Sequence, residues 1–195
     1  MRRRWIGLAA AVLVGCAANR PHAKAARPAM GPQGTRPASE LMPLNLGVSW
    51  TYRRTFLGES GEFKVTVVRK DEEGYFVDDA GGRLMLTPMG LRDADRYLLL
   101  SPLETGQRWR VQVQPNVAEH YEITEDNATV EVPAGRFEHC LVVEAVTNFS
   151  AARRMVIRST YAPKVGMVRS ETRMEDNQGR KVQQVLLELV AYTIP

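Results

Sequence analysis

The sequence predicts an all-β protein with a single domain, built as one strongly bent antiparallel meander sheet that forms a half-barrel or a barrel-like fold. Two observations lead to this fold class. Apolar and polar residues alternate with a period of two in one stretch after another, which is typical of strands that bury one face. Clusters rich in Gly, Asp and Glu separate these stretches at regular intervals, as turns do in antiparallel sheets.

The first predicted strand contains Val48, Trp50 and Tyr52, which alternate with polar residues. Further strands are predicted at residues 63–67, 75–78, 83–87, 109–113, 118–125, 129–132, 140–149, 154–161 and 167–174. The last apolar stretch, residues 182–194, also fits a helical period. Its β-branched composition and the lack of a helix cap favour a strand that is buried on both faces.

A short internal repeat divides the predicted sheet. Pro43-Leu44-x-x-Gly47-x-x-Trp50 recurs as Pro102-Leu103-x-x-Gly106-x-x-Trp109. In each copy Gly allows a tight turn and Trp starts a strand with a large core-facing side chain. The repeat predicts two β-meander halves, each opened by a core Trp, although coincidence is an open alternative because little else aligns at this offset.

The N-terminus has the pattern of a secretory signal peptide. Three arginines at positions 2–4 precede an uncharged apolar stretch at residues 5–14. Ten helical residues span about 15 Å, half of a hydrocarbon core of about 30 Å, which is too short for a membrane span. An ordinary signal peptide and a twin-arginine signal are the alternatives.

The stretch Leu13-Val14-Gly15-Cys16 resembles the lipobox of bacterial lipoproteins. The resemblance implies cleavage before Cys16 and attachment of lipid to its thiol, which makes Cys16 the lipid attachment site. It also implies a location in the cell envelope, with the chain held at the membrane through acylated Cys16. Ala17, where Asp would signal inner-membrane retention, favours the outer membrane, with the chain facing the periplasm.

The predicted organisation is a signal peptide at residues 1–15, a lipidated Cys and flexible tether at 16–40, and an all-β domain at 41–195. The tether is rich in Ala and Pro and shows no apolar period, so it cannot bury enough surface to fold. The formal charge of the whole chain is +4. The positive excess lies entirely before residue 41, since the domain from Leu41 has 19 Lys+Arg and 21 Asp+Glu. The near-neutral domain therefore offers no surface for nucleic acid.

Two later motifs connect the domain with a wider group. Residues 132–137 read Val-Pro-Ala-Gly-Arg-Phe, and residues 161–168 read Tyr-Ala-Pro-Lys-Val-Gly-Met-Val. Together with Gly47-x-x-Trp50-x-Tyr52, they resemble functionally uncharacterised secreted and lipoprotein β-domains of bacteria. The resemblance implies a strongly bent antiparallel sheet but no activity. Phe137 is predicted to plug into the core.

Residue patterns for catalysis and metal binding are incomplete. His139 and Cys140 are adjacent, but neighbours in a strand point to opposite faces, so they cannot pair unless the turn persists through them. Cys140 is interpreted as a small buried residue, with a reactive thiol as the alternative. His120 with Glu122, and Asp93 with Asp95, share faces but make no closed ligand set. No catalytic residue, cofactor or metal is therefore expected.

The expected function is that of a non-enzymatic binding or structural module, monomeric, with an envelope protein, glycan or lipid as partner. The first alternative is a carrier of lipid or another apolar ligand in a half-barrel. The second is a hydrolase with a dispersed site. An apolar cavity of roughly 300–1,000 Å³ would favour the carrier, whereas a cluster of His120, His139 and acids in a cleft would favour the enzyme.

Overall fold

The computed structural model describes residues 36–195. The predicted signal peptide, Cys16 and residues 17–35 of the tether lie outside the described residues. Residues 36–40, assigned to the tether from the sequence, belong to the folded part. Ala38–Leu41 forms the single-turn helix α1, which buries Ala38 and Leu41 and lies beside strand β5. In the described part of the chain, no helix is long and apolar enough to cross a membrane.

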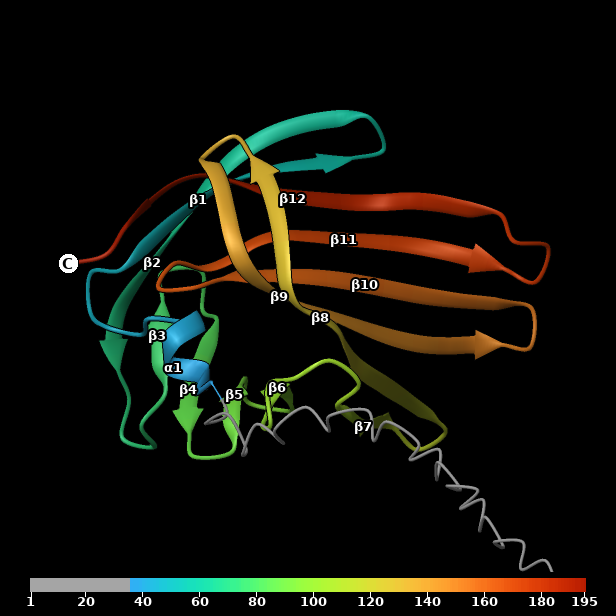
Figure 1. Cartoon of the computed structure of the whole chain (residues 1–195), viewed down its shortest axis with the longest axis horizontal. Helices are drawn as coiled ribbons and strands as arrows, with labels where there is room; N and C mark the ends of the chain where they lie inside the picture. The colour runs from blue at the N-terminus through green and yellow to red at the C-terminus, as the bar shows by residue number, and fades with distance from the viewer. Residues whose placement is uncertain (1–35) are drawn as a thin grey trace, which may run out of the picture. The chain divides into compact units, whose positions relative to one another are not determined.

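The described chain is all-β, as predicted, with twelve antiparallel strands in one sheet. The strands are β1 (Ser49–Phe56), β2 (Glu59–Lys70), β3 (Phe76–Asp78), β4 (Arg83–Thr87), β5 (Gly90–Arg92), β6 (Tyr97–Leu100), β7 (Arg108–Gln114), β8 (Val117–Val132), β9 (Gly135–Ser150), β10 (Arg153–Ala162), β11 (Gly166–Asp176) and β12 (Lys181–Thr193). Figure 1 shows how strongly this sheet bends.

The sheet consists of two six-stranded meanders that share one join. Strands β1–β6 and β7–β12 each pair in sequence order, and β1 pairs with β12 between them. The chain from β6 to β7 therefore connects the two edges of the sheet. Trp109 on β7 donates from Nε1 to the carbonyl oxygen of Tyr97 on β6 at 3.0 Å, so the bent sheet nearly closes on itself.

Both copies of the predicted repeat have the same geometry. Gly47 and Gly106 have positive φ angles, 83° and 93°, which favour glycine. Gly47 N–H donates to Val67 O at 2.9 Å, and Gly106 N–H donates to Ile123 O at 2.8 Å. Each repeat thus fixes the register of its first hairpin, and the prediction of two meander halves is confirmed.

The two tryptophans differ in burial. Trp50 is buried, 3% exposed, as predicted. Trp109 packs against the core but is only half-buried, which corrects the prediction that both are core residues. The reason is position, because β7 is an edge strand and has no neighbour to cover the outer side of the indole. Phe137 also lies half-buried against the core, as a plug would.

Three other predictions need correction. Residues 118–125 and 129–132 form one strand, β8, because an irregular register between Ile123 and Val130 bends the strand without ending it. Strands β5 and β6 were not predicted, since a three-residue strand and the run Tyr97–Leu100 show no alternation. The C-terminal stretch is a strand, as predicted, but most of its residues are half-buried and Leu189 alone in β12 is fully buried.

The long β8–β9 hairpin bends over the sheet and reaches β12, as Figure 1 shows. Ala134 at its tip donates from N–H to Leu189 O at 2.9 Å, and the ring centroids of Phe137 and Tyr192 lie 6.2 Å apart. This end of the sheet is packed. The core lies on the inner face of the bend, the face that carries Trp50 and Tyr121.

Candidate functional site

His139 and Cys140 do not form a catalytic pair. Cys140 is fully buried, and burial raises the pKa of its thiol to about 11. His139 is exposed, with a φ of 55°, and its Nδ1 lies 2.7 Å from Oδ1 of Asn127. The two side chains have different surroundings, so Cys140 is the small buried residue that the sequence predicts.

Of the other candidate polar residues, Glu122 and Asp93 make structural contacts. His120 and Glu122 share the outer face of β8 and line an open groove of about 460 Å³. Arg108 donates to Glu122 at 2.8 Å, and this hydrogen bond lowers the pKa of Glu122. Asp93 accepts the N–H of Asp95 at 2.8 Å and so stabilises its own turn. Within residues 36–195, no three His, Cys, Asp or Glu side chains are grouped to hold a metal ion.

The inner face of the sheet has a different composition. Strand register places one residue from each of eight strands in a single row across this face. From β2 to β7 the row is Glu59, Phe56, Val185, Thr172, Ile157, Ala145, Tyr121 and Trp109. Apart from Glu59 and Thr172, every member is apolar or aromatic.

Burial falls along this row from β8 towards β1. Tyr121 and Ala145 are buried, Ile157 and Val185 are half-buried, and Phe56 is 41% exposed. One neighbouring row adds Met155 and Met174. The other adds Leu187 but also the polar side chains of Arg54, Ser170 and Ser159. We call this half-covered inner surface the trough, and it consists of Phe56, Phe63, Met155, Ile157, Met174, Val185 and Leu187. Three strand spacings from β1 to β10 make it about 14 Å wide.

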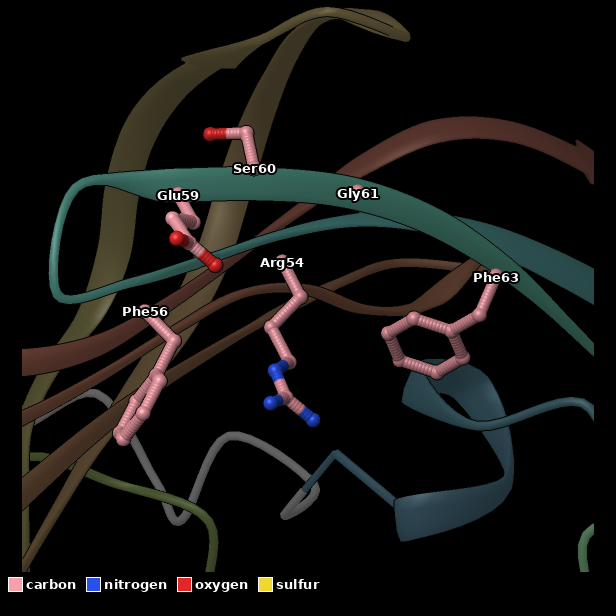
Figure 2. Close-up of a pocket in the computed structure, with 6 residues that line it drawn as sticks. All are labelled: Arg54, Phe56, Glu59, Ser60, Gly61 and Phe63. Carbon is pink, nitrogen blue, oxygen red and sulfur yellow. The ribbon is translucent and has the colours of Figure 1, made fainter.

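A hollow of about 340 Å³ lies at the β1–β2 end of the trough, and Figure 2 shows its lining. The lining residues are Arg54, Phe56, Glu59, Ser60, Gly61 and Phe63. Arg54, Phe56 and Phe63 point to the same side of the hairpin, whereas Ser60 points away. Gly61 lies opposite Arg54 in the register, and the absence of a side chain there leaves space above the guanidinium.

The hollow combines apolar rings with charge. The Arg54 guanidinium carbon lies 5.5 Å from the centroid of the Phe56 ring, and Phe63 lies 5.8 Å from Tyr52, ring to ring. Both phenylalanines of the hollow are 41% exposed. A guanidinium between apolar rings suits a molecule with an apolar body and an acidic or polar group.

A cluster of polar side chains forms hydrogen bonds between the two edges of the sheet, near β6 and β7. Arg96, in the turn before β6, donates to Glu119 Oε2 on β8 at 2.6 Å, and Tyr121 donates to the same oxygen at 2.6 Å. Burial and then the hydrogen bond with Glu119 raise the pKa of Tyr121 above its ordinary value. Tyr121 also stacks on Trp109, with centroids 5.0 Å apart. These contacts satisfy each group, so the cluster is structural.

The outer face of strands β8–β11 carries a chain of ion pairs. Arg158 contacts Glu125 and Glu144, and Arg173 joins Glu144 at 3.5 Å to Glu175 at 2.7 Å. Burial alone would raise the pKa of Glu175, but hydrogen bonds from Arg173 and Arg154 outweigh it and the pKa lies below its usual value. The outer face is thus polar and the inner face apolar.

The sequence analysis did not identify the residues of the trough. A period of two showed that each strand has an apolar face, but it could not show which apolar faces stay half-covered. The one available signal was the short turn at Leu57-Gly58, because Phe56 directly precedes it and Phe63 follows within the same hairpin.

No protein-family model and no curated protein matches this chain. Two solved structures are similar. A candidate exported protein of Bacteroides fragilis with a YmcC-like fold is 17% identical, with 77% of this chain and 97% of that chain covered, at a TM-score of 0.46. A candidate lipoprotein of Parabacteroides distasonis is 13% identical, with 78% and 98% covered, at a TM-score of 0.42. Both scores are too low for either similarity to bear on the function of this chain.

Proposed function

We propose that this chain is an envelope lipoprotein whose β-domain binds an apolar or amphipathic ligand, of the lipid acyl-chain class, without catalysing a reaction. One observation carries the proposal, namely the trough, a mainly apolar part of the inner face that stays half-covered. Soluble domains rarely leave a large contiguous apolar surface uncovered unless it binds something. The hollow of about 340 Å³ lies within the range of ligand sites.

The side chains of the trough favour a flexible apolar ligand. Met155 and Met174 face each other across β10 and β11, and methionine adapts its shape to irregular partners. Ile157, Val185 and Leu187 offer no hydrogen-bond donor or acceptor. Arg54, at the edge of the hollow, can hold an acidic or polar head group while the apolar part lies in the trough.

The proposed location rests on the N-terminal sequence. Arg2–Arg4, the apolar stretch and the stretch ending at Cys16 support export and lipidation, and Ala17 supports the outer membrane. Anchoring would confine the domain near a membrane surface and raise its effective concentration for ligands there. A binding site for acyl chains is useful at that position.

Replacing Cys16 by serine is expected to abolish lipidation and leave uncleaved precursor, because the thiol is the acceptor of the lipid. Mass spectrometry of the wild-type N-terminus should find an acylated Cys16. An unmodified amine at another residue of the mature wild-type chain would contradict the lipoprotein proposal without affecting the ligand proposal.

Two adjacent residues of β12 provide a test of the trough. Val185 lies on the inner face beside Phe56, whereas Leu186 lies on the outer face beside Thr55. Both are half-buried. Val185→Gln is expected to weaken binding of a fluorescent fatty acid about tenfold, since it places a polar amide on the apolar surface. The measurement is a fluorescence titration of the mature chain.

Leu186→Gln is the matched control and should bind the probe as the wild type does. Thermal unfolding of both variants checks that they fold. Equal binding by the wild type and Val185→Gln, or equal losses in the two variants, would contradict a ligand site in the trough.

A further inference from the structure

Four hairpins of the sheet end on the same side. In an antiparallel meander, alternate turns lie at the same end. Besides the turns of the short strands β3–β4 and β5–β6, this end has the turns of β1–β2, β7–β8, β9–β10 and β11–β12, which join the longer strands. Figure 1 shows three of them, those of β7–β8, β9–β10 and β11–β12, at the right of the view. We call this end the rim. At the opposite end, the β8–β9 hairpin is hydrogen-bonded to β12 through Ala134 and Leu189, and Leu44 and Val165 are buried.

Large apolar side chains are exposed at the rim. Leu57, in the β1–β2 turn, is 70% exposed, and Phe149, just before the β9–β10 turn, is 58% exposed. Val113 and Val182 are exposed beside the other two turns. Each of the four hairpins therefore presents at least one apolar side chain to the outside, and no contact within the described chain covers it.

The charges near the rim are mainly positive. Residues 57–58, 115–116 and 151–152, which form three of the turns, contain no carboxylate. Arg153, Arg154, Arg180 and Lys181 flank the β9–β10 and β11–β12 turns. Of the carboxylates beside these four turns, Glu175 and Asp176 are paired with Arg154 and Arg180, both at 2.6 Å, and Glu59 follows the β1–β2 turn. Apolar tips among basic residues fit the interface of an anionic lipid membrane.

We propose that the rim is a membrane-docking surface, with Leu57, Phe149, Val113 and Val182 inserted among lipid head groups and the basic residues beside them facing lipid phosphates. This inference does not depend on ligand binding in the trough. The four hairpin tips would then contact the membrane, and the packed end of the domain would face away from the bilayer.

The chain between Cys16 and the folded part is long enough for this orientation. Twenty residues separate Cys16 from Arg36 (36 − 16), and a fully extended chain of that length reaches at most about 68 Å. The longest strands, β8 and β9, have 16 residues each and span about 53 Å. An anchor at Cys16 can therefore lie in the same membrane that the rim contacts.

The test uses the full lipidated chain in protein-free vesicles of zwitterionic and anionic phospholipid. Single cysteines, Leu57→Cys and Phe149→Cys, carry an environment-sensitive fluorophore. Matched controls are Leu46→Cys and Met89→Cys, which replace equally exposed apolar residues away from the rim hairpins. Buried Cys140, with its pKa raised to about 11 by burial, does not compete for the label.

For the two rim probes, we expect the fluorophore emission to shift to shorter wavelength when vesicles are added, and spin-labelled lipid to quench most of it. The two control probes should show neither effect. Equal responses at rim and control positions, or no response at the rim, would overturn it. Rim probes that are shielded in native envelope fractions but not in these vesicles would identify a protein partner and also overturn the membrane proposal. Because the labelled positions are exposed, the variants are expected to fold.

Discussion

Replacing Trp50 by alanine is expected to lower the free energy of unfolding by about 3–5 kcal/mol, the range for large buried aromatic side chains. The indole is almost fully buried, and its Nε1 donates to Val165 O at 2.6 Å. Gly166 lies against the same ring, since a Cβ there would approach Trp50 Nε1 to 3.1 Å. The substitution thus removes apolar burial and leaves the carbonyl of Val165 without its donor. Urea denaturation of the mature chain measures the effect.

Trp109→Ala provides the comparison within the repeat. Trp109 makes an equivalent bond, from Nε1 to Tyr97 O at 3.0 Å, but it is only half-buried on an edge strand. Its loss should cost about half as much as that of Trp50, because about half as much apolar surface returns to water. A cost below about 1 kcal/mol for Trp50→Ala would show that the indole is not a core residue.

Arg96→Ala is expected to destabilise the fold by about 3 kcal/mol, because it leaves the Glu119 carboxylate buried without its cation. The Arg96–Glu119 pair connects the turn before β6 to β8, across the gap between the edges of the sheet. Its loss should also loosen the Trp109 and Tyr97 contact beside it. Thermal unfolding and hydrogen exchange of β6 and β7 amides would record the two effects.

The matched control is Arg108→Ala. Arg108 on β7 pairs with Glu122 on β8 at 2.8 Å, but its side chain is 72% exposed. Exposed pairs contribute about 0–1 kcal/mol, so this variant should unfold almost as the wild type does. Similar costs for the two variants would mean that the Arg96–Glu119 pair is no more important than an ordinary surface pair.

The strands that bury one face were predictable, because alternation is a local property of the sequence. The local sequence alone predicts Trp50 with Tyr52 on β1 and the turn glycines Gly47 and Gly106. The β-branched composition of the C-terminal stretch correctly favoured a strand over a helix. Each of these features depends on residues within one strand or one turn.

Features that depend on contacts between distant strands were not predictable. Arg96 and Glu119 are 23 residues apart, and nothing in either local sequence indicates the other. The trough brings Phe56, Ile157 and Val185 into one row through the pairing of β1 with β12, which joins the two ends of the domain. A period of two defines the apolar face of a strand, but the bend of the sheet decides whether that face is covered.

The separation of the two faces gives the trough its physical basis. On the outer face, Arg158, Glu144 and Arg173 form ion pairs across neighbouring strands and cover the sheet with charge. On the inner face, burial decreases from the closed side, near Tyr121, to the β1–β2 hairpin. A ligand would complete the inner core where the chain itself does not.

Photochemical labelling can show whether a ligand binds in the trough. The mature chain is incubated with a photoreactive long-chain fatty acid and irradiated, and the labelled residues are mapped by mass spectrometry. We expect labels on inner-face residues of β1, β10 and β12, at or beside Phe56, Ile157 and Val185. Unlabelled fatty acid should compete for the site and reduce the labelling. Labels confined to the outer face, or labelling that unlabelled fatty acid does not reduce, would contradict it.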